Sequence, residues 1–253
     1  MLAIKAVVKS FGGLVALKDV GFSVGKGSIS ALIGPNGAGK TTLLNIISGI
    51  FPPDGGEILF SGTIISKLSA ARIARAGISR TFQQVELFSD MTVIENVMVG
   101  RYPKTRAGFL SSGLRLPGVL KEEKDVKKRS LEILDYIGLG SREKELASSL
   151  PLGEQRILEI GRALATEPKL LLLDEPAAGL NIKETRSLGE MIKRLRDDKG
   201  ITVLLVEHDM DLVMRISDRI TVLNFGEVIA GGTPQEVQKN PAVIEAYLGA
   251  DED

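Results

Sequence analysis

Three observations predict an α/β fold in which helices cover both faces of a mostly parallel sheet. Short apolar runs of strand length, such as residues 170–173 and 202–206, alternate with segments whose apolar residues recur at helical spacing. A glycine-rich segment, 34–39, joins one such run to a helical segment. Another run ends in two acidic residues, Asp174 and Glu175. Because parallel sheets bind ligands at the carboxyl ends of their strands, these features together predict a ligand site.

The first part of the chain predicts several strands before any long helix. Residues 1–33 hold short β-branched runs separated by glycine turns, and residues 57–60 follow another glycine pair. Residues 64–76 predict a turn and a short basic helix, and residues 78–82 predict a further strand. The amino-terminal part is therefore expected to be rich in β-structure.

The pattern becomes helical between about residues 85 and 164 and then returns to strands. The later strand-like runs are 170–173, 202–206, 220–223 and 228–230. We therefore predict a single domain, 1–253, whose core consists of residues 1–84 and 165–253, with residues 85–164 inserted as a helical subdomain. The subdomain includes a segment, 101–121, rich in proline, glycine and basic residues, which composition alone assigns to a flexible loop.

The composition excludes several classes of protein. Basic and acidic residues both number 32, so the formal net charge is zero and nucleic acid is not expected as the main partner. The chain has no cysteine, which excludes disulfides and thiolate metal sites. No apolar run has the length of a membrane span, and the amino terminus lacks the apolar stretch of a signal peptide. We expect a cytosolic chain that would reach a membrane only through another polypeptide.

The glycine-rich segment fits the phosphate-binding pattern G-x-x-x-x-G-K-[ST] at every position. Its backbone N–H groups and the following helix N-terminus can hold a polyphosphate, Lys40 can reach the β- and γ-phosphates, and Thr41 can bind Mg²⁺. An ordinary glycine turn is the alternative, but strand, loop and helix all lie in register. The predicted nucleotide-binding residues are Gly34, Pro35, Asn36, Gly37, Ala38, Gly39, Lys40, Thr41 and Thr42.

The acidic pair completes a site for phosphoryl transfer. Asp174 can hold Mg²⁺ directly or through water, and Glu175 can polarise the water that attacks the γ-phosphate. Taken alone, the pair would only suggest a strand that ends in a polar loop. With Gly34 to Thr42 upstream, the pair predicts phosphoryl transfer with Mg²⁺ as the metal.

Two further residues follow strand-like runs. His208 is the only histidine in the chain and follows residues 202–206, so we interpret it as a γ-phosphate sensor, although a lone histidine is more often structural. Gln83 ends the run 80–83, and its amide could reach Mg²⁺ and the attacking water. Taken alone, Gln83 would be an ordinary loop residue.

A second turn opens a helix at residues 150–155, and Leu152, Gly153 and Glu154 lie at its start. A helix N-terminus is a potential anion site. Since one chain needs a single phosphate cradle for each nucleotide, a second cradle suggests that two chains close over ATP.

Taken in order, these segments resemble the nucleotide-binding subunit of an ABC transporter, and the resemblance covers essentially the whole chain. It assigns 34–42 to Walker A, Gln83 to the Q-loop, 150–155 to the signature, 170–175 to Walker B and His208 to the switch histidine. Residues 178–181 fall at the D-loop. Phe11 falls where the family places an aromatic ring on adenine, although a core position is an equally good interpretation of this residue alone.

The resemblance implies a P-loop NTPase core with an antiparallel amino-terminal β part and an inserted helical subdomain. It also implies a homodimer, or a heterodimer with a paralogous ATPase subunit, in which each ATP lies between the Walker motifs of one subunit and the signature of the other. Two transmembrane permease subunits would hold the dimer on the cytoplasmic face of the membrane. A periplasmic or extracellular solute-binding protein would be an indirect partner.

Several segments are similar to the ATPases of branched-chain amino acid importers. They are 101–121, 175–181, 207–210 and 231–249. We therefore predict that the chain powers import of branched-chain or other hydrophobic amino acids. The alternative is the ATPase of a related transporter, such as the lipopolysaccharide extraction machine, which the 101–121 insertion disfavours.

A role outside transport and a role without hydrolysis both have less support. An ABC ATPase that acts on DNA or ribosomes usually carries a coiled-coil insertion or a second cassette, and the sequence has neither. A nucleotide switch without turnover is disfavoured because Glu175 and His208 are both present.

The sequence departs from the family pattern at two places. Pro151 and Leu152 stand where the signature usually has serine and glycine, so no hydroxyl or N–H is available from residue 151. We expect Gly153 and the helix behind it to hold phosphate through backbone groups. Asn181 replaces the usual D-loop aspartate, which we interpret as a feature of the importer branch.

Overall fold

A computed structural model describes residues 1–102 and 117–248. Most of the predicted loop, 103–116, and the end of the chain lie outside the described residues. The chain forms two compact units, one of residues 1–80 with 169–253 and one of residues 81–168. The predicted domain limits differ from these units by a few residues, and the domain assignment itself stays a prediction.

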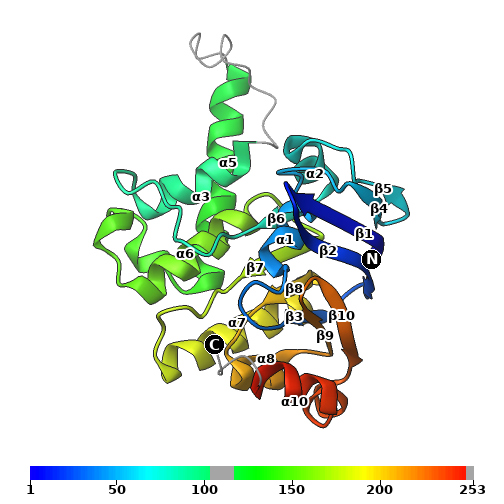
Figure 1. The fold of residues 1–253 in the computed structure, drawn as a ribbon. Helices are drawn as coiled ribbons and strands as arrows, with labels where there is room; N and C mark the ends of the chain where they lie inside the picture. Colours follow the sequence, from blue (N-terminus) through cyan, green and yellow to red (C-terminus); the bar gives the residue numbers. More distant parts are fainter. Residues whose placement is uncertain (103–116, 249–253) are drawn as a thin grey trace. The chain divides into compact units, whose positions relative to one another are not determined.

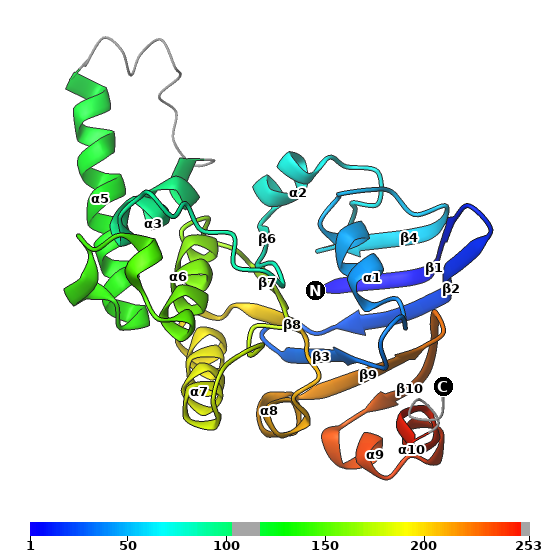
Figure 2. The ribbon, with the colours of Figure 1, turned by 60° about the vertical axis from the view of Figure 1, so that its left-hand side comes forward.

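The first unit holds two sheets (Figures 1 and 2). An antiparallel sheet has the strand order β2-β1-β4-β5, and a six-stranded sheet has the order β10-β9-β3-β8-β7-β6. In the larger sheet every neighbouring pair is parallel except β10 with β9. The strands are β1 (Leu2–Phe11), β2 (Leu14–Val24), β3 (Ile29–Ile33), β4 (Gly55–Phe60), β5 (Thr63–Ile64), β6 (Ile78–Arg80), β7 (Leu170–Asp174), β8 (Thr202–Val206), β9 (Arg219–Asn224) and β10 (Glu227–Gly232).

Helices of the first unit pack against these sheets and bury the apolar strands. Every residue of β3, β7 and β8 is buried, as expected for strands covered on both faces. Helix α1 contributes Leu43, Leu44, Ile46 and Ile47 to the core that both sheets share. The helices are α1 (Lys40–Ile47), α2 (Ala70–Ala76), α7 (Ile182–Lys199), α8 (Met210–Ile216), α9 (Pro234–Gln238) and α10 (Pro241–Leu248).

The second unit is helical. Its elements are α3 (Val93–Arg101), α5 (Pro117–Ile137), the 3₁₀ turns η2 (Gly140–Arg142) and η3 (Ala147–Ser149), and α6 (Leu152–Leu164). Thr92 begins α3 with a capping box, because its hydroxyl accepts from the Glu95 N–H and the Glu95 side chain accepts from the Thr92 N–H. Contacts of α6 with both α3 and α5 hold the unit together.

Two expectations of the element pattern are wrong at their ends. The predicted strand 78–82 stops at Arg80, because β7 pairs only with Ile78 to Arg80. The predicted loop 101–121 is helical at both ends, since α3 includes Arg101 and α5 starts at Pro117. Proline fits the first turn of a helix, where its missing N–H is not needed. At the start of α9, Thr233 forms a capping box with Glu236, and Pro234 occupies the first turn.

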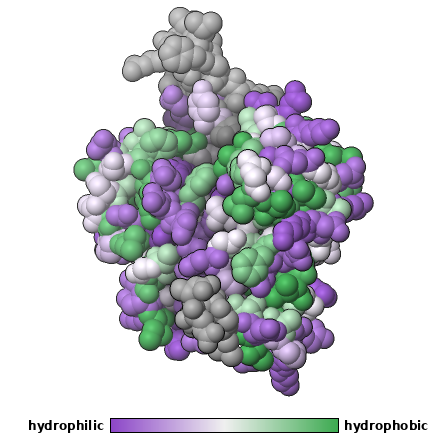
Figure 3. Space-filling model, viewed as in Figure 1, coloured by the Kyte–Doolittle hydropathy of each residue, from purple (hydrophilic) through white to green (hydrophobic). Residues whose placement is uncertain are grey.

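Polar side chains spread over the viewed surface, with apolar ones among them (Figure 3). Among the described residues, none of the helices combines the length and the apolar character needed to cross a lipid bilayer.

Candidate functional site

The predicted phosphate-binding segment, 34–39, links the buried strand β3 to helix α1, as the sequence predicts. Gly34 and Gly39 adopt φ values of 151° and 102°, which side chains rarely allow. A Cβ atom at Gly34 would collide with the Leu223 carbonyl oxygen, and one at Gly39 would lie 2.7 Å from the Ala16 carbonyl oxygen. These glycines therefore let the loop pack directly on the backbones of β9 and β2. The role of the Ala16 backbone was not visible in the sequence, because it depends on tertiary packing.

Helix α1 begins with its first N–H groups available to an anion. Gly39 gives no side-chain cap, and the first turn contains no acidic residue. A helix start without a competing carboxylate favours phosphate, because unsatisfied N–H groups and the helix dipole both attract negative charge.

Lys40 lies in the buried part of the site. Its Nζ atom donates to the carbonyl oxygens of Gly34 and Pro35 at 2.6 and 2.9 Å. Burial lowers the pKa of the Lys40 ammonium, while the nearby charges of Glu175 and Asp174 oppose this shift. The structure thus brings the predicted phosphate-binding lysine into the electrostatic field of the two predicted Walker B carboxylates.

Strand pairing places Glu175 beside His208. Asp174 pairs with Val206 at the ends of β7 and β8, and the Glu175 N–H donates to the Val206 carbonyl oxygen at 2.8 Å. The His208 Nδ1 atom lies 3.5 Å from Glu175 Oε1. Glu175 also adopts φ 47°, a left-handed conformation that costs about 1 kcal/mol for a residue with a Cβ atom. Parallel pairing of β7 and β8 therefore places these two residues close together.

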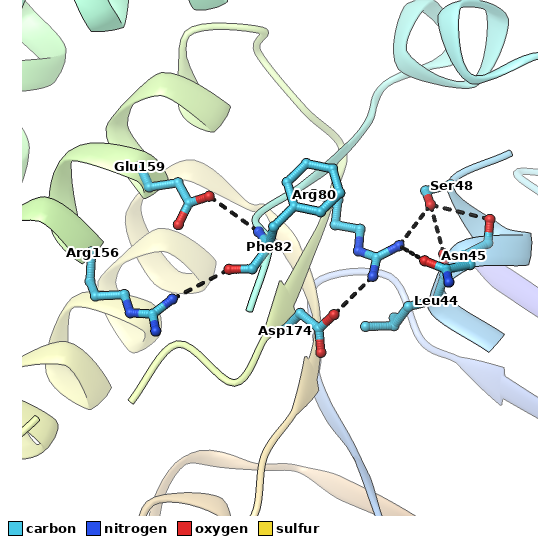
Figure 4. Close-up of polar contacts among 8 residues, drawn as sticks. All are labelled: Leu44, Asn45, Ser48, Arg80, Phe82, Arg156, Glu159 and Asp174. Carbon is cyan, nitrogen blue, oxygen red and sulfur yellow. Dashed lines mark hydrogen bonds and ion pairs between the residues drawn. The ribbon is translucent and has the colours of Figure 1, made fainter. Parts of the chain in front are cut away.

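Asp174 is held by an arginine that the sequence analysis missed. Arg80 Nη2 lies 2.8 Å from Asp174 Oδ2, and both side chains are almost fully buried (Figure 4). The other oxygen, Oδ1, is buried and accepts no hydrogen bond from the part of the chain that the structure describes. The only signal in the sequence was a charged residue inside a strand-like run.

The residues around Asp174 fit Mg²⁺. This ion prefers oxygen ligands and usually combines one or two carboxylates with phosphate oxygens and water. The unused Oδ1 atom of Asp174 and the exposed Thr41 hydroxyl are suitable oxygens. Within residues 1–102 and 117–248, no group of three or more acidic or histidine side chains could hold a metal alone.

Glu207 is a second residue that the sequence analysis missed. Its carboxylate accepts the backbone N–H groups of Ala177, His208 and Asp209 at 2.8, 2.9 and 3.1 Å. Burial raises the pKa of this carboxyl group, and the hydrogen bonds from the N–H groups of Ala177, Asp209 and His208 partly oppose the shift. The side chain joins the loop after Glu175 to the loop that carries His208. An acid directly before the only histidine was the available signal.

Phe11 lies half exposed at the end of β1. Its ring meets Phe51 edge-on, with centroids 5.3 Å apart, and the Lys9 ammonium lies 5.4 Å from the Phe11 centroid. The ring is not a core residue, but its role toward adenine stays a prediction.

In the second unit, helix α6 holds the residue before Gln83 by both backbone groups. The Phe82 N–H donates to Glu159 Oε1 at 3.2 Å, and Arg156 Nη1 donates to the Phe82 carbonyl oxygen at 3.3 Å (Figure 4). Burial raises the pKa of the Glu159 carboxyl group. Gln83 itself is exposed.

The signature segment starts α6 without a side-chain cap, because Pro151 is the N-cap residue. Gly153 is buried, Leu152 is exposed, and Glu154 pairs with Arg142 at 3.1 Å. Asn181 caps α7 by accepting the N–H groups of Lys183 and Glu184, both at 3.0 Å. Asparagine and aspartate are equally good caps, so this departure leaves the local structure intact.

Comparison with known proteins identifies the family. A family model described as "ABC transporter" matches residues 17–178, which is more than half of the chain. The chain belongs to the ABC transporter family. A second model, "Branched-chain amino acid ATP-binding cassette transporter", matches residues 227–253 of this ABC ATPase. The predicted family, its P-loop fold class and its activity as an ATPase are thereby confirmed.

The ABC ATPase has close relatives of known name. It is 46% identical over 249 residues to the high-affinity branched-chain amino acid transport ATP-binding protein LivG of Salmonella typhimurium, covering 98% of each chain. It is 39% identical over 242 residues to a probable LivG of Archaeoglobus fulgidus, covering 96% of this chain and 93% of that protein.

Solved structures of ATP-binding cassettes also match. The ADP conformation of one cassette of an ABC transporter has a TM-score of 0.86 and 36% identity, with 98% of both chains covered. A dimeric cassette bound to ADP and Pi has a TM-score of 0.78 and 29% identity, covering 92% of this chain and 99% of that one. The roles of the individual site residues of this ABC ATPase stay predictions.

Proposed function

We propose that this ABC ATPase uses ATP hydrolysis to power an importer of branched-chain or other hydrophobic amino acids. One observation supports ATP hydrolysis, namely that the predicted catalytic residues gather at the ends of the neighbouring parallel strands β3, β8 and β7. These residues are Lys40 after β3, His208 after β8, and Asp174 and Glu175 at the end of β7, with His208 Nδ1 3.5 Å from Glu175 Oε1. The names of its relatives and the family matched at residues 227–253 support the import of branched-chain amino acids.

The chain's own residues supply the parts of phosphoryl transfer. The loop 34–39 and the α1 N-terminus would hold the β- and γ-phosphates, and Lys40 would turn from the loop carbonyls to the γ-phosphate. Glu175 would orient and polarise the attacking water, while His208 would hydrogen-bond the γ-phosphate. Positioning and charge neutralisation are the main demands of this reaction.

Mg²⁺ is the metal that fits the site. Thr41 and Asp174 would hold it, and Gln83 keeps its predicted role as a further ligand. When bound, the ion would neutralise charge on the phosphate oxygens.

The active form is proposed to be a dimer, either of two copies or with a paralogous ATPase subunit. Each ATP would lie between the Walker motifs of one subunit and the signature residues Leu152, Gly153 and Glu154 of the other. The dimeric cassette with ADP and Pi among the matching structures supports a dimer. Two permease subunits would then bind the dimer at the cytoplasmic membrane face, and a solute-binding protein would deliver the amino acid.

The comparisons favour the amino acid importer over the lipopolysaccharide extraction machine, because the relatives cited above carry branched-chain amino acid transport in their names. Nucleic acid is not a proposed partner, in accord with the zero net charge.

The test compares wild type with Glu175→Gln in ATP and Mg²⁺, measuring phosphate release and oligomeric state by size-exclusion chromatography. We expect the variant to dimerise with ATP while hydrolysis falls by at least about 10²-fold. A variant that hydrolyses ATP like wild type would overturn the role of Glu175. Uptake of labelled leucine by vesicles that contain the subunit with its permeases tests the solute class. Absence of leucine uptake would contradict this solute class, and uptake that does not depend on ATP would contradict the coupling to hydrolysis.

A further inference from the structure

Arg80 is a cation whose side chain is buried at the end of the edge strand β6. It is the last residue of β6, where it pairs with Leu172 of β7. Its side chain is 5% exposed, and that of its partner Asp174 is 2% exposed. Burial of both charges is expensive unless they are paired and hydrogen-bonded, so the arrangement needs a specific explanation.

The guanidinium joins three elements at once (Figure 4). Nη2 binds Asp174 Oδ2 at 2.8 Å, while Nη1 donates to Asn45 Oδ1 at 2.7 Å and to Ser48 Oγ at 3.0 Å. The Ser48 hydroxyl is fixed in turn, because it donates to the Leu44 carbonyl oxygen at 2.8 Å. Asn45 belongs to α1 and Ser48 is its C-cap residue, so Arg80 fixes the end of β7 relative to the helix that begins with Lys40 and Thr41.

The contact with Arg80 gives the two carboxylate oxygens of Asp174 different surroundings. Oδ2 is occupied by Arg80, whereas Oδ1 accepts no hydrogen bond from the described residues although it is buried. Lys40 does not fill this gap, because its Nζ atom donates to Gly34 and Pro35 carbonyl oxygens. A buried carboxylate oxygen left without a donor is a strong acceptor for a cation or its bound water.

We propose that Arg80 is a positioning residue that holds Asp174 by Oδ2, so that Oδ1 faces the metal of the nucleotide. The planar fork of arginine suits this task, since it can bind a carboxylate and α1 in one fixed plane. Outer residues that orient a metal ligand commonly change metal affinity by about 10- to 100-fold when they are replaced. The inference rests on the proposed function, because it requires the metal and nucleotide to bind here.

A purely structural ion pair is the competing explanation, and metal affinity distinguishes the two. The experiment titrates Mn²⁺ into protein with ADP and follows free Mn²⁺ by electron paramagnetic resonance. Calorimetry with a chelator measures ADP affinity without metal. For Arg80→Met we expect the Kd of Mn²⁺ to rise about tenfold, with ADP affinity in chelator changed less than about twofold.

Arg196→Met is the matched control. Arg196 also pairs with a carboxylate of the same unit, Asp218, at 3.0 Å, but it lies on α7. We expect this variant to leave the Kd of Mn²⁺ unchanged. An equal rise in both variants would mean that loss of any ion pair weakens the site, and it would overturn the inference.

A double variant tests whether Arg80 acts through Asp174. Asp174→Asn should weaken Mn²⁺ binding by itself, and adding Arg80→Met should weaken it by less than about twofold more, because coupled residues are not additive. Full additivity of the two effects would overturn the inference.

Milder variants keep the test decisive if Arg80→Met does not fold. Arg80→Lys keeps the charge but loses the fork, and Asn45→Ala removes one anchor of Arg80. Each should raise the Kd of Mn²⁺ by about threefold, below the full effect of losing an outer residue. Wild-type affinity in both would overturn the inference while leaving the proposed function intact. A wild type that binds neither ADP nor Mn²⁺·ADP would overturn both.

Discussion

Helices α1 and α6 both begin after a turn and without a side-chain cap, yet their surroundings differ. The start of α1 has a glycine loop, a buried lysine and no acidic residue in its first turn. The start of α6 has Pro151, which lacks an N–H group, and Glu154, which pairs with Arg142. Both helix dipoles place partial positive charge at the start of the helix, so the neighbouring groups decide what each helix start can bind.

The comparison teaches that a helix N-terminus becomes a phosphate site through what the chain adds around it. At α1 the loop backbone and Lys40 form a site that can hold phosphate within one subunit. At α6 the described residues offer Gly153 and the helix dipole, and the buried guanidinium of Arg156 on the same helix donates to the Phe82 carbonyl oxygen. This difference agrees with the proposed dimer, in which α6 meets a phosphate that another subunit already holds.

Removing the lysine should break the α1 site and have the largest effect. For Lys40→Ala we expect ATP hydrolysis to fall about 10³-fold, because a preorganised charge at the phosphates is lost. Phosphate release measures the effect, and Lys26→Ala on the exposed turn before β3 is the matched control. A Lys40→Ala variant with wild-type turnover would mean that the loop backbone alone holds the γ-phosphate.

Adding a carboxylate to the α6 start should sharpen the comparison. For Gly153→Asp we expect hydrolysis to fall about 10- to 100-fold through repulsion of phosphate, with ATP affinity of the monomer unchanged. Ser141→Asp adds an exposed acid elsewhere in the same unit and is the control. If Gly153→Asp lowered the ATP affinity of the monomer as much as it lowered hydrolysis, α6 would also contact ATP without a second subunit.

Glu207 should stabilise the loops at the nucleotide end of the first unit. Glu207→Gln leaves one amide oxygen for three backbone donors, so we expect the free energy of unfolding to fall by about 1–3 kcal/mol. Chemical denaturation measures this difference, with Glu190→Gln on the surface of α7 as the control. A variant as stable as wild type would mean that water replaces these hydrogen bonds without loss.

The same variant has a pH signature. Burial raises the pKa of Glu207 in the folded state, so its favourable contribution is complete below the unfolded pKa of about 4.3 and decreases as pH rises through the folded value. The stability advantage of wild type over Glu207→Gln should therefore shrink as pH rises above about 4.3. An advantage that grows with pH would give the opposite sign and would mean that the backbone donors outweigh burial.

The smallest expected effect comes from restoring serine to the signature. Pro151→Ser gives α6 a capping hydroxyl, which should stabilise the helix by about 0.5–1 kcal/mol. It also offers a donor to the γ-phosphate, so we expect hydrolysis to rise by up to about threefold, consistent with one added neutral hydrogen bond. Thermal unfolding and phosphate release measure both effects. Slower hydrolysis would mean that proline at this position is required.

The strand, turn and helix around Lys40 could be predicted from the sequence because the information is local. The pattern from Gly34 to Thr42 fixes the turn, the lysine and the helix start within one short segment. The neighbourhood of Glu175 and His208 was also predictable, since both follow strands and parallel strands end at one edge. These inferences needed only strand assignment and the general behaviour of parallel sheets.

The contacts of Arg80 and Glu207 could not be predicted in this way. Arg80 meets Asp174 only because β6 pairs with β7, and it meets Asn45 only because α1 packs beside them. Glu207 accepts the Ala177 N–H only because the loops after β7 and β8 lie side by side. Residues that act through tertiary contacts leave a weak mark in a single sequence, here a charge within or beside an apolar strand.

Arg80 also affects the charge balance of the subunit when neither nucleotide nor metal is bound. Its positive charge balances Asp174 inside the protein, so the fold carries a permanent internal counter-ion. Proteins whose buried carboxylates rely on a metal lose stability when the metal is withdrawn. We therefore expect the subunit to keep its fold when a chelator removes Mg²⁺.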